Sequence, residues 1–226
     1  MSEKNNESYM DYLNRKIVNK NYTMTENDVN DFNEARLLDE EGRYETIPVT
    51  TSTTPAYINP HVKAAFLFMR DYVKEKYNII LDVNYAYRTF AEQADLYNEI
   101  VATEGQKEAD KKVAKPGESE HHTGLAIDVQ VRKVMPKFVP NKPIVRKIFD
   151  RITIPMCQKK LWKVAPQFGF IQRYERGKEK LTGIETPEPW HYRYVGKETA
   201  EYMRKNGLTF EEYHKMQYDD SNTPEV

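Results

Sequence analysis

An alternating segment near the middle of the chain constrains the fold more than any other feature. Residues 124–131 read GLAIDVQV, in which every second side chain from Leu125 onward is large and apolar. A period of two is that of a β-strand with one buried face. Asp128 then lies on the opposite, polar face, beside the small Ala126. The segment therefore predicts a sheet that buries one face and presents a carboxylate on the other.

Other segments predict the remaining strands and the helices that cover them. Alternation and turn residues predict strands at 79–87, 170–174 and 190–195, and in the first of these the expected buried set is Leu81, Val83, Tyr85 and Tyr87. Apolar spacing and capping residues predict helices at 9–18, from Pro60 behind the cap Asn59, from the Thr89–Glu92 capping box, at 144–149, at 161–168, at 198–205 and from Thr209. This mixed order indicates an α+β fold with a small central antiparallel sheet flanked by helices.

The length of the chain fits one domain. Its 226 residues can bury a core without disulfides, and we expect a single domain over residues 1–226. Within it, residues 1–8 are polar and expected to be disordered, and residues 9–60 form an N-terminal helix and an irregular wrap. Residues 132–155 hold four Pro and no single period, so we interpret them as an excursion from the core.

Charge and cysteine content narrow the classes of function. The chain has 34 Lys and Arg against 35 Asp and Glu. This near balance predicts no large electrostatic field that would attract the protein to nucleic acid or an anionic membrane. Cys157 is the one cysteine, so a disulfide framework and a four-cysteine zinc site are excluded. Any metal must be bound by His and carboxylate groups, and five His are available.

No targeting or membrane segment is visible in the sequence. The first residues, MSEKNNESYMDYLNRK, lack an apolar run, and no stretch is long enough to span a bilayer. We expect a cytoplasmic protein if the chain is complete, and a cell-envelope protein if an export segment has been removed.

Two short segments could together form a hydrolytic zinc site. Such a site needs three ligands from His and carboxylate, a position open to water, and a nearby carboxylate that accepts a proton. The segment SEHHTGLAIDV offers His121 or His122 together with Asp128, and spacing does not choose between the two His. The segment EPWHYRYVG offers Glu188 and His191, which can point the same way only if Pro189 interrupts the strand, so we expect the regular strand to begin at Trp190.

Each of these residues also has an ordinary structural interpretation. Asp128 could cap a turn or pair with Arg132, and Glu188 could be a solvated loop acid. His61 and His214 are expected to be solvated or satisfied within the core. The HExxH helix of many metalloproteases is absent from the sequence.

Several spaced motifs resemble the VanY-type D-alanyl-D-alanine carboxypeptidases, within the zinc peptidases named after lysostaphin, D-alanyl-D-alanine peptidases and hedgehog. The matching residues are Tyr87-Arg88-Thr89 with Gln93, Ser119-Glu120-His121 with Gly124, Ala126 and Asp128, and Glu188-Pro189-Trp190-His191 with Arg193-Tyr194. Further similarity runs through Gly169-Phe170-Ile171, Arg173-Tyr174 and the closing Leu208 to Tyr213. Two departures are Thr89 in place of the usual Ser and the longer 132–155 excursion.

The resemblance implies a hedgehog/D-Ala-D-Ala peptidase-like fold and a set of roles. It implies zinc bound by His121, Asp128 and His191, and a metal-bound water that Glu188 activates as general base. It further implies that Arg88 acts near the scissile bond, and that Ser119, Gln93 and Tyr174 contact the substrate. The implied substrates are peptidoglycan stem peptides or precursors, from which the enzyme removes a terminal D-Ala, and we expect a monomer.

Three alternatives share these motifs. One is an L,D-carboxypeptidase that trims tetrapeptide stems, and another is a phage-type endopeptidase that cuts between L-Ala and D-Glu. The third is a hedgehog-like zinc-binding module without activity, which the presence of Glu188 and Arg88 disfavours.

Overall fold

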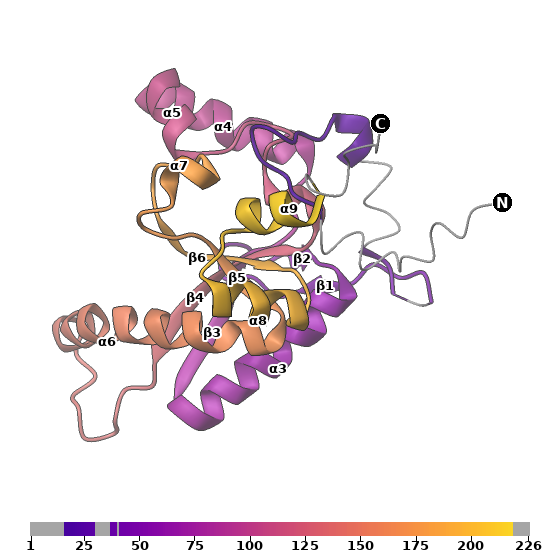
Figure 1. Ribbon diagram of the computed structural model, residues 1–226. Helices are drawn as coiled ribbons and strands as arrows, with labels where there is room; N and C mark the ends of the chain where they lie inside the picture. Colours follow the sequence, from indigo (N-terminus) through magenta and orange to yellow (C-terminus); the bar gives the residue numbers. More distant parts are fainter. Residues whose placement is uncertain (1–15, 30–36, 40, 219–226) are drawn as a thin grey trace, which may run out of the picture.

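A four-stranded antiparallel sheet lies at the centre of the molecule (Figure 1). The computed structural model describes residues 16–29, 37–39 and 41–218. The strands follow the order β3-β4-β6-β5, and every neighbouring pair is antiparallel. Their bounds are β3 Ile79–Tyr85, β4 Ala126–Lys133, β5 Phe170–Tyr174 and β6 Glu188–Tyr194, and a separate pair is formed by β1 Thr46–Ile47 and β2 Ala56–Tyr57. The predicted α+β fold with a small antiparallel sheet is confirmed.

Helices surround this sheet and occupy most of the connections. They are α3 Pro60–Tyr77, α4 Phe90–Glu104, α5 Gln106–Lys112, α6 Pro143–Val164, α7 Glu179–Thr182, α8 Lys197–Asn206 and α9 Phe210–Tyr218, with the 3-10 helices η1 Glu120–Thr123 and η2 Ala165–Phe168. In the described part of the chain, none of the helices combines the length and apolarity that a bilayer crossing requires.

The main core lies on one face of the sheet, between the strands and helices α3 and α6. The side chain of Asn59 accepts hydrogen bonds from the first turn of α3, which confirms the predicted cap. The helix buries one stripe, formed by Val62, Phe66, Met69 and Val73. Strand β4 contributes Ile127, Val129 and Val131 to the same cluster, and α6 contributes Cys157, Leu161 and Val164. Because side chains alternate along a strand, Asp128 of β4 lies on the other face. The alternation of β4 therefore separates the core from the polar groups described below.

The alternation predicted for residues 79–87 holds only in part. Leu81 and Val83 are buried as predicted, but Tyr85 is exposed and Ala86 is buried. The register between β3 and β4 shifts between Val83 and Tyr85, and such a bulge exchanges the faces of the residues that follow. The prediction that Tyr85 points into the core is therefore wrong.

The largest difference from the predicted elements lies in the 132–164 region. Instead of a short helix at 144–149 and another at 161–168, α6 runs without interruption through Pro155 and is followed by η2. Proline removes one backbone donor and crowds the preceding turn, which favours an end to a helix. Here the helix continues because Cys157 and Leu161, beyond the proline, pack into the core.

Smaller differences concern the ends of the chain and one connection. Most of the helix predicted at 9–18, and all of residues 1–8, lie outside the described residues, while residues 16–18 are not helical. Helix α5 occupies part of a stretch for which we predicted no element. The caps at Thr89 and Thr209 are confirmed, since each Thr exchanges hydrogen bonds with the Glu three residues later.

Candidate active site

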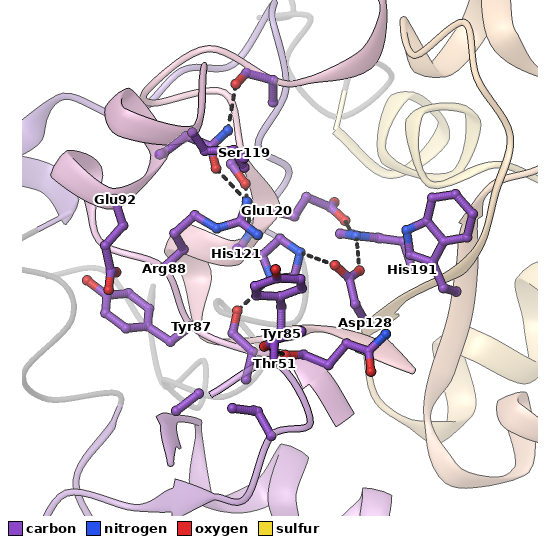
Figure 2. A pocket seen from close by; sticks show the side chains of 18 of the residues that line it. Thr51, Tyr85, Tyr87, Arg88, Glu92, Ser119, Glu120, His121, Asp128 and His191 are labelled. Atoms are coloured by element: carbon purple, nitrogen blue, oxygen red, sulfur yellow. Dashed lines mark hydrogen bonds and ion pairs between the residues drawn. The ribbon is translucent and has the colours of Figure 1, made fainter. Parts of the chain in front are cut away.

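Two histidines and one aspartate from three different elements meet on the polar face of the sheet (Figure 2). His121 comes from η1, Asp128 from β4 and His191 from β6, and β-pairing sets Asp128 directly opposite His191. One nitrogen or oxygen atom of each lies within 4.8 Å of the others, and all three side chains are buried. Two imidazoles and a carboxylate are a donor set that suits zinc, so these residues fit the metal that the sequence motifs imply.

In both histidines, the ring nitrogen that points away from Asp128 has a hydrogen-bond partner within the protein. His121 Nδ1 lies 2.5 Å from the backbone carbonyl of Ala86, which can only accept, so this nitrogen carries the proton and Nε2 faces Asp128. His191 Nε2 lies 3.3 Å from Glu120 Oε2, and its Nδ1 lies 3.1 Å from Asp128 Oδ1. Partners of this kind fix the ring orientation of metal-binding histidines and direct the inner nitrogens toward a common point.

The electrostatics of the cluster keep its carboxylate ionised. Burial would raise the pKa of Asp128, but His121 and His191 hold it well below its usual range. Burial lowers the pKa of His121. For His191 burial also acts to lower the pKa, yet hydrogen bonds to Asp128 and Glu120 raise it to about 9. An ionised carboxylate therefore lies between the two imidazole rings.

Behind His191, a buried ionic network continues to the C-terminal helix. Glu120 Oε1 accepts from Arg173 Nε at 2.9 Å and lies 3.5 Å from Arg193 Nη1. Arg173 in turn donates two hydrogen bonds to Glu211 of α9, at 2.7 and 3.2 Å. Glu120, Arg173 and Arg193 are almost fully buried. Although burial alone would raise the pKa of Glu120, Arg173, His191 and Arg193 hold it far below its usual value.

Glu188 reaches the cluster because β6 is irregular. Tyr192 pairs with Gln172, and Glu188 pairs with Tyr174. Between these two pairs β6 contains more residues than β5, so β6 forms a bulge. The strand begins at Glu188 and not at Trp190 as predicted, but this bulge produces the expected convergence. Glu188 Oε2 lies 3.8 Å from His191 Nδ1, and burial raises the pKa of Glu188 to about 7.

Arg88 lies at the junction of β3 and α4 and lines the same pocket as the cluster. Its Nη1 donates to Gln93 Oε1 at 2.7 Å, and its guanidinium lies 5.3 Å from the centre of the Tyr85 ring. Gln93 also donates to the carbonyl of Ala114 at 2.6 Å, so both ends of its amide are engaged within the protein. Burial lowers the pKa of Arg88. Gln93 thus aims Arg88 into the pocket.

The remaining residues singled out by the sequence take different positions. Ser119 is buried, caps η1 by accepting from the backbone of His121 at 3.3 Å, and lines the pocket. The ring of Tyr174 lies 5.0 Å from that of His191. His122 points elsewhere: its Nε2 accepts from the Gly117 backbone and its Nδ1 lies 2.8 Å from the Arg88 carbonyl. The structure therefore separates the two adjacent histidines, and His121 is the one in the cluster.

A pocket of about 620 Å³ opens over these groups. Arg88, Ser119 and His121 line one part of it, and Figure 2 shows the Arg88 side chain extending toward the His121 ring. Thr51, Tyr57, Tyr85 and Trp190 extend the wall beyond the polar cluster. This volume is typical of sites for small molecules and short peptides.

Glu120 is the main residue that the motif analysis left without a role. It stands between Ser119 and His121 in a matched motif, and that position was the available signal. Its partners Arg173 and Arg193 lie far away in the sequence, so no local spacing predicts the network.

Comparison with known proteins gives consistent results. The family model described as VanY, D-alanyl-D-alanine carboxypeptidase, matches residues 55–197. YodJ of Bacillus subtilis (strain 168) is 36% identical over 157 residues, which is 70% of this chain and 53% of YodJ. The chain spans about half the length of the curated relatives it matches.

Solved structures also share the fold. The LdcB LD-carboxypeptidase has a TM-score of 0.67 and 30% identity, covering 88% of this chain and 84% of LdcB. A mutant of the vancomycin-resistance D,D-pentapeptidase VanY in complex with Zn(II) has a TM-score of 0.64 and 25% identity, covering 89% of this chain and 98% of that one.

Proposed function

Because the chain belongs to the VanY family of D-alanyl-D-alanine carboxypeptidases, we propose that it is a zinc-dependent carboxypeptidase that removes the terminal D-Ala from peptidoglycan stem peptides. One observation carries this proposal. The two histidines and the aspartate of the cluster meet in one pocket with Glu188 and Arg88. Together they offer a set of metal ligands, a carboxylate base and a cationic side chain.

His121 Nε2, Asp128 and His191 Nδ1 are the proposed zinc ligands. Ala86 and Glu120 support this assignment because they engage the outer nitrogens of the two rings. When bound, zinc supplies a Lewis acid that polarises a carbonyl and makes water more acidic. A VanY structure with Zn(II) gives the same fold, which supports zinc over other cations.

Glu188 is the proposed general base because each of the other carboxylates in the pocket already has a different role. Four carboxylates line the pocket among the described residues. Asp128 belongs to the ligand set, Glu120 pairs with Arg173, and Glu92 is engaged in the α4 capping box. Glu188 remains to accept a proton from the attacking water and to return it to the leaving amine.

Arg88 is proposed to bind the substrate. Its guanidinium stays charged and can donate two parallel hydrogen bonds to the terminal carboxylate or the developing oxyanion. Gln93 holds Arg88 in place at 2.7 Å, and Ser119 and Tyr174 complete the pocket wall.

Incubation with a panel of substrates tests the bond that is cleaved. Zinc-loaded protein would be mixed with D-Ala-D-Ala dipeptide, a pentapeptide stem and a tetrapeptide stem, and the products identified by mass. We expect the pentapeptide to lose one D-Ala. Trimming of the tetrapeptide instead would identify an L,D-carboxypeptidase, a candidate favoured by the similarity to LdcB. Cleavage between L-Ala and D-Glu, or no cleavage of any substrate, would overturn the proposal.

A matched pair of variants tests the base. Glu188→Gln keeps the shape of the side chain but cannot accept a proton, so kcat should fall about 10²- to 10⁴-fold while zinc remains bound. The control is Glu185→Gln, an exposed acid in the same connection, which should leave kcat unchanged. Full activity of Glu188→Gln would assign the base to another group.

A further inference from the structure

The segment that links β4 to η2 has a strongly unbalanced charge. Residues 132–164 contain ten Lys and Arg and a single acid, Asp150, in a chain whose net charge is −1. The rest of the chain therefore carries a net charge of about −10 by the same count. The prediction of no attraction to an anionic membrane considered the chain as a whole, and it does not describe this segment.

Helix α6 in this segment also exposes a continuous apolar stripe. Ile144, Ile148, Ile152 and Met156 recur at every fourth position and are between 55% and 67% exposed. Residues four apart lie above one another on a helix, so these side chains form one face, named here the outer stripe. The inner side of α6 is a different set, Cys157, Leu161 and Val164, which packs in the core. The core therefore leaves the outer stripe uncovered.

Basic side chains accompany the outer stripe along its length. Lys147, Arg151, Lys159 and Lys163 are all exposed, and helical geometry places them on or beside the stripe. The loop before α6 adds Phe138, which is 88% exposed and stands between Lys137 and Lys142 in the sequence. In Figure 1 the loop hangs below α6, and the Pro143 end of the helix points to the left, away from the other labelled helices.

We propose that the outer stripe and the Phe138 loop form a docking surface for an anionic phospholipid bilayer. Helices that lie in the membrane interface have one apolar face and a neighbouring face rich in Lys and Arg. The apolar side chains enter the boundary between headgroups and acyl chains, while the cations contact the lipid phosphates. Each basic residue near such a surface contributes about fivefold to the binding constant at low salt.

The positive charge of this segment, together with its apolar stripe, favours an anionic bilayer over a second copy of the chain or a soluble polyanion. In a dimer formed through the outer stripe, two segments with ten cations and one acid each would face one another, and like charges would oppose association. A soluble polyanion would pair with the cations but leave the isoleucines and Phe138 in water. An anionic bilayer accommodates both the charge and the apolar stripe.

The docking surface and the substrate pocket lie on opposite sides of the sheet. Helix α6 packs on the face that carries Ile127 and Val129, whereas Asp128 and the pocket occupy the other face. A molecule docked through α6 would therefore hold the pocket away from the bilayer. On the function proposed above, the pocket of a docked molecule would stay open to stem peptides in the surrounding water.

Vesicle flotation of the full chain tests the docking surface. Protein would be mixed with vesicles of phosphatidylcholine alone or with added phosphatidylglycerol, at low and at high salt. We expect binding to the anionic vesicles only, weakened by salt. Binding to neither vesicle, or equal binding to both, would overturn the proposal.

Two pairs of variants separate the contributions. Ile148→Ser with Ile152→Ser should lower vesicle binding at least about tenfold, and Lys147→Gln with Arg151→Gln should lower it about 25-fold at low salt. The controls are Phe68→Ser and Lys107→Gln, an exposed aromatic and an exposed cation on other helices, which should change nothing. Circular dichroism and hydrolysis of a soluble peptide should be unchanged in every variant.

Two outcomes with these variants would reject the bilayer as occupant. If the serine variant bound anionic vesicles as well as the unmodified chain, the surface would be a site for soluble polyanions. If the unmodified chain formed dimers in sedimentation experiments and the serine variant did not, the outer stripe would be an interface between two copies.

Discussion

Two regions of this molecule carry many charged side chains. In one region they are buried beside opposite charges, and in the other most of them are exposed cations. Around the candidate metal centre, Glu120, Arg173 and Arg193 are almost fully buried, and each charge contacts one of opposite sign. In residues 132–164 the cations outnumber the single acid by ten to one, and many of them are exposed. The net charge of −1 counts every residue of the chain and describes neither of these patterns.

The comparison shows that burial, and not the number of charges, decides whether a charged side chain needs a partner within the protein. A buried ion must have a partner because the cost of desolvation is several kcal/mol. An exposed cation is solvated by water and remains available to a partner outside the chain. Substitutions in the two regions should therefore differ widely in effect.

The largest effect is expected for His191→Ala. This change removes a proposed ligand and also removes the group that donates to Glu120 at 3.3 Å. Stoichiometric zinc should be lost and hydrolysis should fall to background, as measured by elemental analysis and peptide assay. His61→Ala, at an exposed histidine of α3, is the control and should keep zinc. A zinc-loaded His191→Ala protein would contradict the ligand set.

The next largest effect is expected for Arg173→Met. Methionine fills a similar space, but Glu120 and Glu211 would lose the cation that lies between them. Breaking a buried ion pair on one side costs about 3–5 kcal/mol in the free energy of unfolding. Urea unfolding would measure this loss.

Arg176→Met is the matched control for that change. Arg176 is exposed three residues later in the chain, so its effect should stay within about 0.5 kcal/mol. If the two variants lost the same stability, the buried network would be no more important than a surface charge.

Local patterns predicted the scaffold of the site well. The alternation of residues 124–131 placed Asp128 on the face away from the core, and the Thr89–Glu92 capping box placed the start of α4. Alternation and capping depend on a few neighbouring residues, so they can be recognised in one sequence. Convergence of Glu188 and His191 was also expected, although through a later strand start than the structure shows.

Long-range packing explains what the sequence did not predict. Helix α6 continues through Pro155 because the core holds Cys157 and Leu161, and this overrides the local preference for a helix end. The Glu120–Arg173 pair joins residues far apart in the chain, which no spacing rule detects. The exposed face of Tyr85 follows from a bulge set by pairing with β4.

An intermediate effect is expected for Glu120→Gln. The amide fills the same space but lacks the negative charge that faces His191 Nε2 and Arg173. Loss of such a partner lowers zinc affinity about 10- to 100-fold. Competition with a chelator would measure the zinc Kd, and unfolding of the zinc-free protein would separate this effect from stability.

Glu118→Gln, two residues earlier, serves as the control for Glu120. Glu118 Oε2 lies 3.3 Å from the Lys115 backbone nitrogen and has no contact with His191 among the described interactions. Its zinc Kd should match that of the unmodified chain. An unchanged zinc Kd in Glu120→Gln would mean that the carboxylate orients His191 no better than an amide does.

The smallest effect is expected for Lys147→Gln in α6, and it is a gain in the free energy of unfolding instead of a loss. Lys147 and Arg151 are exposed and four residues apart, and like charges at this spacing destabilise a helix by about 0.2–0.5 kcal/mol. The variant should therefore unfold at slightly higher urea concentration at low salt, and the difference should vanish at high salt. Arg146→Gln provides the contrast, because Arg146 pairs with Asp150 at 2.9 Å and its loss should slightly destabilise the helix. A loss above about 1 kcal/mol in Lys147→Gln would exceed the range for an unpaired surface charge and would place Lys147 in the class of Arg173.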